Sequence, residues 1–119
     1  MTFDHVGIPT DEKQSGENWV ESTRVWVTSP RDSKYRIEYL RFEPDSPCAE
    51  IVRTRPHVAY AVNEEEWRRL LAGAEIVIEP FKPCEHMTIA YVKQHDVCIE
   101  YILYTNADYW FDSYQPGWV

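Results

Sequence analysis

A short pattern of polar residues occurs twice in this 119-residue chain, in the same order each time. Asp4-His5-Val6-Gly7 is followed by Ile37-Glu38-Tyr39, and Pro56-His57-Val58-Ala59 is followed by Ile99-Glu100-Tyr101. Such a repeat indicates two copies of one structural unit. Because a unit of about sixty residues is too small to bury a stable core alone, we expect the two units to pack into one domain.

The two copies differ in length. Glu38 follows His5 by 33 residues (38 − 5), whereas Glu100 follows His57 by 43 (100 − 57). The second copy has a helix signature between its strands: Asn63 as N-cap, acidic residues in the first turn, and Gly73 as a stop. The corresponding residues 10–18 are polar without an apolar face, which predicts a loop. We therefore expect the first copy to have lost its helix, leaving the site more open on that side.

Alternating apolar residues and bounding prolines predict seven strands. They cover residues 2–9, 22–29, 35–43, 57–62, 74–79, 87–93 and 97–104. The first unit then spans about 1–45 and the second about 56–105, joined by a proline-rich crossing segment, and the fold class is α+β. The tail, 106–119, is rich in aromatic residues, so we expect it either to cover the site or to pack against a second subunit.

The repeated histidines and glutamates lie where strand side chains are expected to be buried. His57 shares its strand face with Ala59 and Ala61, which leave room above the strand. Glu38 and Glu100 each lie mid-strand between apolar residues, and a carboxylate there is costly to bury unless it is paired or bound. Two imidazoles and two carboxylates suit a divalent ion such as Zn, Ni, Co, Mn or Fe.

Charge and composition argue against several other classes of protein. The net charge is −8 and the basic residues form no patch, so we expect neither nucleic acid nor anionic membranes as partners. The three cysteines, Cys48, Cys84 and Cys98, have no CxxC spacing, which argues against a disulfide framework and a structural zinc site. The sequence has no signal-peptide pattern and no stretch approaching the roughly 18 apolar residues of a membrane span. We therefore expect a cytoplasmic protein.

The doubled motifs resemble those of the vicinal oxygen chelate superfamily, which includes glyoxalase I, bleomycin-resistance proteins and extradiol dioxygenases. The resemblance covers most of the chain, about residues 3–104. It implies two βαβββ modules, here with the first lacking its helix, that form a cup-shaped, incomplete barrel. It also implies a metal site made by the first and last strands of each module: His5, Glu38, His57 and Glu100. This ligand set is most similar to that of the bacterial type of glyoxalase I.

The resemblance implies a metal-dependent, glyoxalase-like lyase or isomerase. Its substrate would be a small molecule with vicinal oxygens, such as an α-hydroxy carbonyl compound, and its reaction a metal-assisted proton transfer. Glu100 is the favoured general base because its module is the better preserved, and Glu38 is the alternative.

Two other functions stay open on this resemblance. One is a metal-free small-molecule binding protein of the bleomycin-resistance type. The other is an extradiol-type dioxygenase, for which a fourth ligand, Glu38, would be superfluous. Members of the superfamily often dimerise, which makes a homodimer a further expectation.

Several other residues are secondary candidates. His86 is a candidate for the rim of the cup, whereas His95 lies in a turn and is expected to be solvated. Trp26 and Thr88 are expected to line the cup, although a register shift of one residue would turn each to the other face. The remaining candidates either hold a substrate carboxylate or are exposed strand charges: Arg24, Arg36 and Arg41.

Overall fold

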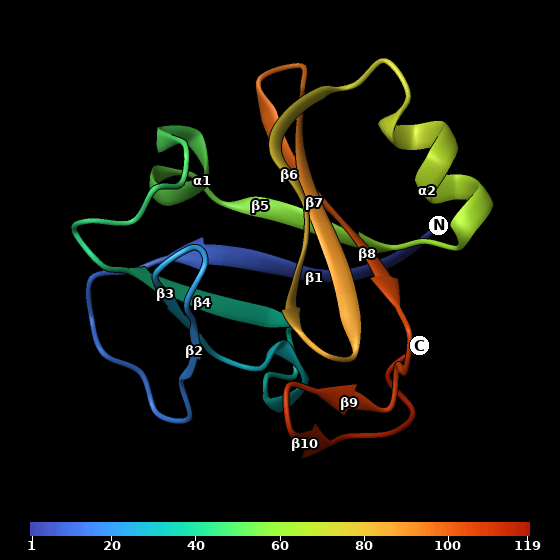
Figure 1. Cartoon of the computed structure of the whole chain (residues 1–119). Coiled ribbons are helices and arrows are strands. Elements are labelled where there is room, and N and C mark those ends of the chain that lie inside the picture. The colour runs from blue at the N-terminus through green and yellow to red at the C-terminus, as the bar shows by residue number, and fades with distance from the viewer.

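The computed structural model describes all 119 residues as an α+β chain built on one eight-stranded sheet (Figure 1). The strands are β1 (Thr2–Pro9), β2 (Asn18–Val20), β3 (Val25–Val27), β4 (Ile37–Phe42), β5 (His57–Ala61), β6 (Glu75–Cys84), β7 (Met87–Gln94) and β8 (Val97–Tyr104). Helices are few: the 3-10 turn η1 (Pro30–Asp32), α1 (Glu50–Thr54) and α2 (Glu64–Leu71). β9 (Tyr109–Trp110) and β10 (Ser113–Tyr114) form a separate small hairpin.

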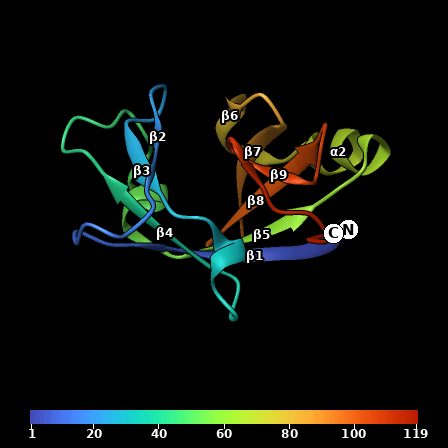
Figure 2. The same cartoon turned by 90° about the horizontal axis from the view of Figure 1, so that it is seen from below.

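The sheet has the order β2-β3-β4-β1-β5-β8-β7-β6 and curves into a nearly closed cup. In Figure 2, β1 and β5 run along the base while the outer strands of each half rise on either side. β1 pairs with β4 in parallel, β5 pairs with β8 in parallel, and the two halves meet where β1 and β5 run antiparallel. The expected fold class is confirmed: two similar modules form an incomplete barrel, and no helix separates β1 from β2.

Two strands of the sheet differ from the expected ranges. The predicted strand 22–29 is instead a turn at 21–24, with Arg24 in the left-handed region (φ 49°), followed by the short β3. The turn connects β3 to a further strand, β2, and the sequence patterns did not predict β2. β6 also continues beyond Pro80, its expected end, to Cys84. Prolines are tolerated there because β6 is an edge strand whose register with β7 shifts repeatedly.

Helix α2 packs on the outer face of the sheet. Trp67, Leu70 and Leu71 contact a cluster formed by Val62, Val92 and Tyr101, which is separate from the apolar cluster inside the cup. A helix in this position does not bound the interior. The expectation that loss of the first module's helix opens the site is therefore wrong. The loss also explains only part of the ten-residue mismatch, because β6 and β7 are longer than β2 and β3.

The N-terminus of α2 is fixed by a capping box. The Asn63 side chain accepts a hydrogen bond from the Glu66 backbone N–H (2.8 Å), and the Glu66 carboxylate accepts one from the Asn63 N–H (3.0 Å). We expect Asn63→Ala to lower the free energy of unfolding by about 1 kcal/mol in chemical denaturation, and Asn63→Asp to have little effect. Equal stability of the alanine variant and the wild type would contradict this.

The C-terminal tail packs against the interior of the cup and against the first module. Trp110, in the tail, is 3% exposed and belongs to the apolar cluster inside the cup. Arg31 holds the tail against the first module by donating hydrogen bonds to the carbonyls of Ala107 and Gln115 (both 2.8 Å).

None of the helices has the length and apolar character needed to cross a membrane.

Candidate metal centre

The two repeated histidines and two repeated glutamates come together at the base of the cup. They lie on the four central strands: His5 on β1, Glu38 on β4, His57 on β5 and Glu100 on β8. All four are buried, with exposures between 0% and 5%. One ligand atom from each lies within 4.8 Å of the others. The structure thus brings together all four residues that the sequence singled out, from positions far apart in the chain.

The strand register explains this convergence. Gly7 of β1 lies opposite Glu38 on one side and His57 on the other. Ala59 of β5, the equivalent residue of the second module, lies opposite His5 and Glu100. Each histidine is followed two positions later by a small residue, so the four long polar side chains meet above two small ones.

The distances within the cluster suit ligands of one ion. Glu100 Oε1 lies 3.3 Å from His5 Nε2 and 3.0 Å from His57 Nε2. Glu38 Oε1 lies 3.2 Å and 3.7 Å from the same two nitrogens. Nitrogen and oxygen ligands at about 2.1 Å from a shared ion are separated by about 3 to 3.5 Å when they are neighbours around it. The cluster therefore needs little rearrangement to surround a cation.

The ligand atoms also lack other partners. His5 Nε2, His57 Nε2, Glu38 Oε1 and Glu100 Oε1 are all buried and none makes a hydrogen bond. A buried polar atom that makes no hydrogen bond is costly, and these four face one another as histidine–carboxylate pairs without hydrogen-bond geometry. A divalent cation would satisfy all four, so the residues fit a metal ion. The donor set does not select one metal from the borderline divalent ions.

Burial and neighbouring charges shift the pKa values of His5, Glu38 and Glu100. Burial by itself lowers the pKa of His5, but the carboxylates of Glu38, Asp4 and Glu100 outweigh it and raise that pKa well above its usual value. Burial raises the pKa of Glu38. Burial also opposes ionisation of Glu100, but the two imidazoles lower its pKa to about 2. A metal ion entering this cluster would therefore have to displace a proton.

Asp4 holds His5 in place from behind. This fully buried carboxylate accepts hydrogen bonds from His5 Nδ1 (2.6 Å), the Tyr104 hydroxyl (2.8 Å) and Trp118 Nε1 (2.9 Å). A proton held on Nδ1 leaves Nε2 free to face the cluster. Sequence reasoning gave neither Asp4 nor Trp118 a role, although Asp4 is part of the first motif and Trp118 of the aromatic tail.

This network predicts that Asp4 sets the metal affinity of the site. We expect Asp4→Asn to weaken metal binding by about 10- to 100-fold, measured by competition with a chromophoric chelator. Trp118→Phe, which keeps an aromatic ring and removes the indole N–H, should weaken it less. Asp112→Asn, an exposed acidic residue, is the matched control. An affinity for Asp4→Asn equal to that of the control would show that the network does not orient His5.

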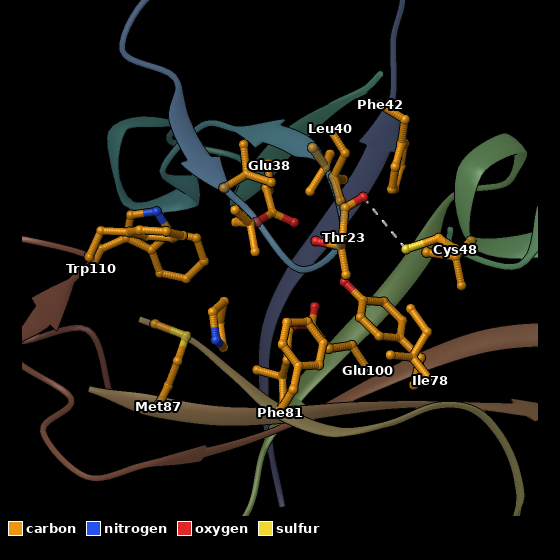
Figure 3. Close-up of a pocket in the computed structure, with 18 residues that line it drawn as sticks. Thr23, Glu38, Leu40, Phe42, Cys48, Ile78, Phe81, Met87, Glu100 and Trp110 are labelled. Atoms are coloured by element: carbon orange, nitrogen blue, oxygen red, sulfur yellow. Dashed lines mark hydrogen bonds between the residues drawn. The ribbon is translucent and has the colours of Figure 1, made fainter. Parts of the chain in front are cut away.

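An apolar pocket opens above the cluster and is lined by both glutamates (Figure 3). Its empty volume, including the open mouth, is about 450 Å³. The expectation that Trp26 and Thr88 line the cup is wrong, because each side chain lies on the opposite face of its strand. The lining residues are their immediate neighbours, which are Val25, Val27, Met87 and Ile89. Trp26 instead packs against Trp19, with ring centroids 4.9 Å apart.

The three candidate arginines do not reach the pocket either. Arg24 is paired with Asp45 (2.7 Å) and Arg41 with Glu17 (2.8 Å). Arg36 lies 3.8 Å over the ring of Trp118. Holding a substrate carboxylate is therefore not their role; two form ion pairs and the third packs on the tail.

The two histidines outside the ligand cluster, His86 and His95, do not line the pocket. His86 stacks on Tyr109 with ring centroids 4.5 Å apart and is not part of the lining, so this candidate does not belong to the pocket. His95 is exposed in the β7–β8 turn, as expected.

Part of the tail borders the pocket. Trp110 lines it and meets the ring of His5 edge-on, with ring centroids 5.9 Å apart. The tail thus covers the chain's own site.

Comparisons with known proteins give the fold and no function. No model of a known protein family matches the sequence, and no curated protein matches it. The crystal structure of a hypothetical protein from Bacillus halodurans C-125 is similar, with a TM-score of 0.63 and 19% sequence identity. The match covers 88% of this chain and 95% of that one.

Proposed function

We propose that this chain is a glyoxalase-like metalloenzyme, a lyase or isomerase, that transfers a proton within a small molecule carrying two neighbouring oxygens. His5, Glu38, His57 and Glu100 would hold the divalent ion, which would be Zn, Ni, Co, Mn or Fe. The observation that carries the proposal is a set of four buried ligand atoms that face one another without making a hydrogen bond, two of whose residues also line a pocket. The three free cysteines fit a reducing compartment such as the cytoplasm.

The proposed chemistry assigns one task to the ion and the others to side chains. A bound divalent ion would polarise a carbonyl oxygen and make the adjacent C–H more acidic. Glu100, or alternatively Glu38, would take that proton: the C–H bond breaks and an O–H bond forms on the carboxylate. The same group would then return the proton to the neighbouring atom of the substrate. The apolar lining and Trp110 would keep water from competing for the proton.

Solvent exchange tests this proposal without knowledge of the natural substrate. Metal-loaded protein in D₂O is incubated with small α-hydroxy ketones such as hydroxyacetone, and deuterium incorporation beside the carbonyl is followed by NMR. We expect exchange above that caused by free metal. We also expect a loss of about 100-fold or more in Glu100→Gln, or in Glu38→Gln if that residue is the base. His95→Ala, in the exposed turn, is the control. Exchange that neither glutamine variant slows would contradict the proposal.

A metal-free binding protein is the second candidate, and the pocket itself favours it. Fourteen of the eighteen lining residues are hydrophobic, which suits retention of an apolar ligand without any reaction. This function predicts equal ligand affinity with and without chelator. The metalloenzyme predicts that affinity for a vicinal-oxygen compound falls when the metal is removed.

A further inference from the structure

We propose that the pocket selects small, uncharged ligands whose pair of neighbouring oxygens is their only strongly polar group, the remainder being apolar. This inference rests on the proposed function and specifies its substrate class. The starting observation is the lining, which joins the two glutamates to a wall of aliphatic and aromatic side chains. Figure 3 shows Glu38 and Glu100 among residues such as Leu40, Phe81 and Met87.

Away from the ligand cluster, the pocket wall contains no group that would neutralise an anionic substituent of the substrate. No lysine, arginine or histidine is among its lining residues. Two cations lie beside lining residues. Arg31 lies 5.9 Å from the ring of Trp110 and donates hydrogen bonds to tail carbonyls, and Arg53 donates one to the Cys48 carbonyl. An anion transferred from water into such a site without a partner loses several kcal/mol. The net charge of −8 adds repulsion at long range.

A cationic substrate is disfavoured for a different reason. The lining has two acidic groups, Glu38 and Glu100, and both belong to the ligand cluster. Once they share a divalent ion, no further carboxylate lines the pocket to pair with an ammonium group. The other polar side chains of the lining include the hydroxyls of Thr23 and Tyr91, which are neutral and can donate or accept a hydrogen bond. The polar handles for the body of the substrate are therefore uncharged.

The size of the pocket limits the substrate as well. The space inside it that admits the centre of a water-sized sphere is about 30 Å³, so side chains must move to admit more than a few atoms of a ligand. A small ring or a short branched chain therefore requires less movement of the lining than a large conjugate with charged arms. The inferred class comprises neutral α-hydroxy ketones with apolar substituents and compounds of similar shape.

The test compares ligands matched in shape and different in charge, with tryptophan fluorescence as the readout because Trp110 borders the pocket. On zinc-loaded protein the series is 4-methylcatechol, 3,4-dihydroxyphenylacetate and dopamine. On metal-free protein the pair is benzyl alcohol and benzoate, which depends on the lining alone. We expect the neutral member of each set to bind about tenfold tighter or more. A charged member that binds as tightly as the neutral one in both sets would overturn the inference.

One substitution should change the preference in a defined way. Phe81 is partly exposed at the pocket, so Phe81→Lys can place an ammonium group there without burying it. We expect the affinity for benzoate relative to benzyl alcohol to rise about tenfold, and Phe81→Gln, without charge, to leave the ratio unchanged. An unchanged ratio in the lysine variant would also count against the inference. If zinc does not bind at all, the proposed function fails, while the metal-free pair still tests the lining.

Discussion

Replacing Gly7 with alanine is expected to weaken metal binding by about 100-fold or more. Gly7 lies opposite His57 in the β1–β5 ladder, and the imidazole of His57 covers it. A Cβ at this position would overlap that ring, coming within 2.6 Å of Nδ1. The substitution would therefore push His57 away from the other three ligands. The backbone of Gly7 is not in the left-handed region, so the effect is steric and not a result of backbone strain.

The affinity of Gly7→Ala is compared with that of Val6→Ala, a neighbouring change on the opposite face of β1. Isothermal titration with Zn²⁺ is the measurement, supported by circular dichroism to show that both variants are folded. Val6→Ala should bind zinc as the wild type does. A Gly7→Ala variant that binds zinc with wild-type affinity would mean that His57 is not a ligand in the position described.

Metal removal is expected to have the second large effect, on stability. An ion that binds only the folded chain stabilises it by about 4 kcal/mol when the free ion is at about 1,000 times its dissociation constant. For a chain of this length that corresponds to a fall in Tm of roughly 15 °C when a chelator is added. The effect is large because, without an ion, four buried ligand atoms lack hydrogen-bond partners.

Two variants test whether the change in Tm comes from metal bound to the ligand cluster. The difference in Tm between metal-loaded and chelator-treated protein should nearly vanish in the double variant Glu38→Gln, Glu100→Gln. It should persist in His86→Ala, whose side chain stacks on Tyr109 outside the cluster. A wild type with the same Tm in chelator and in excess metal would contradict the account, as would a full shift in the double variant.

The ligand cluster was predictable because strand geometry and repetition act together. Side chains alternate along a strand, so the two motifs place His5 and His57, and Glu38 and Glu100, on equivalent faces of equivalent strands. The role of Gly7 was contained in the same motif but needs the β1–β5 register to be recognised. The helix α2 was predictable from its local signals, Asn63 and the acidic first turn, which do not depend on the rest of the fold.

The pocket wall was harder to predict because a one-residue change inverts a strand face. Alternation alone places Val25 and Val27 on one face and Trp26 on the other, but it does not say which face points inward; the valines line the pocket. A strand of three residues such as β2 is too short for alternation to identify it. The tail residues Trp110 and Trp118 reach the site only through long-range contacts, which no local pattern encodes.

The most direct test of the central claim is the metal content of the purified protein. The wild type and the single alanine variants of His5, Glu38, His57 and Glu100 are prepared without chelators and analysed by elemental mass spectrometry. The account predicts close to one transition-metal ion per wild-type chain and a strongly reduced content in each of the four variants. A wild type without metal, or four variants with wild-type metal content, would contradict it.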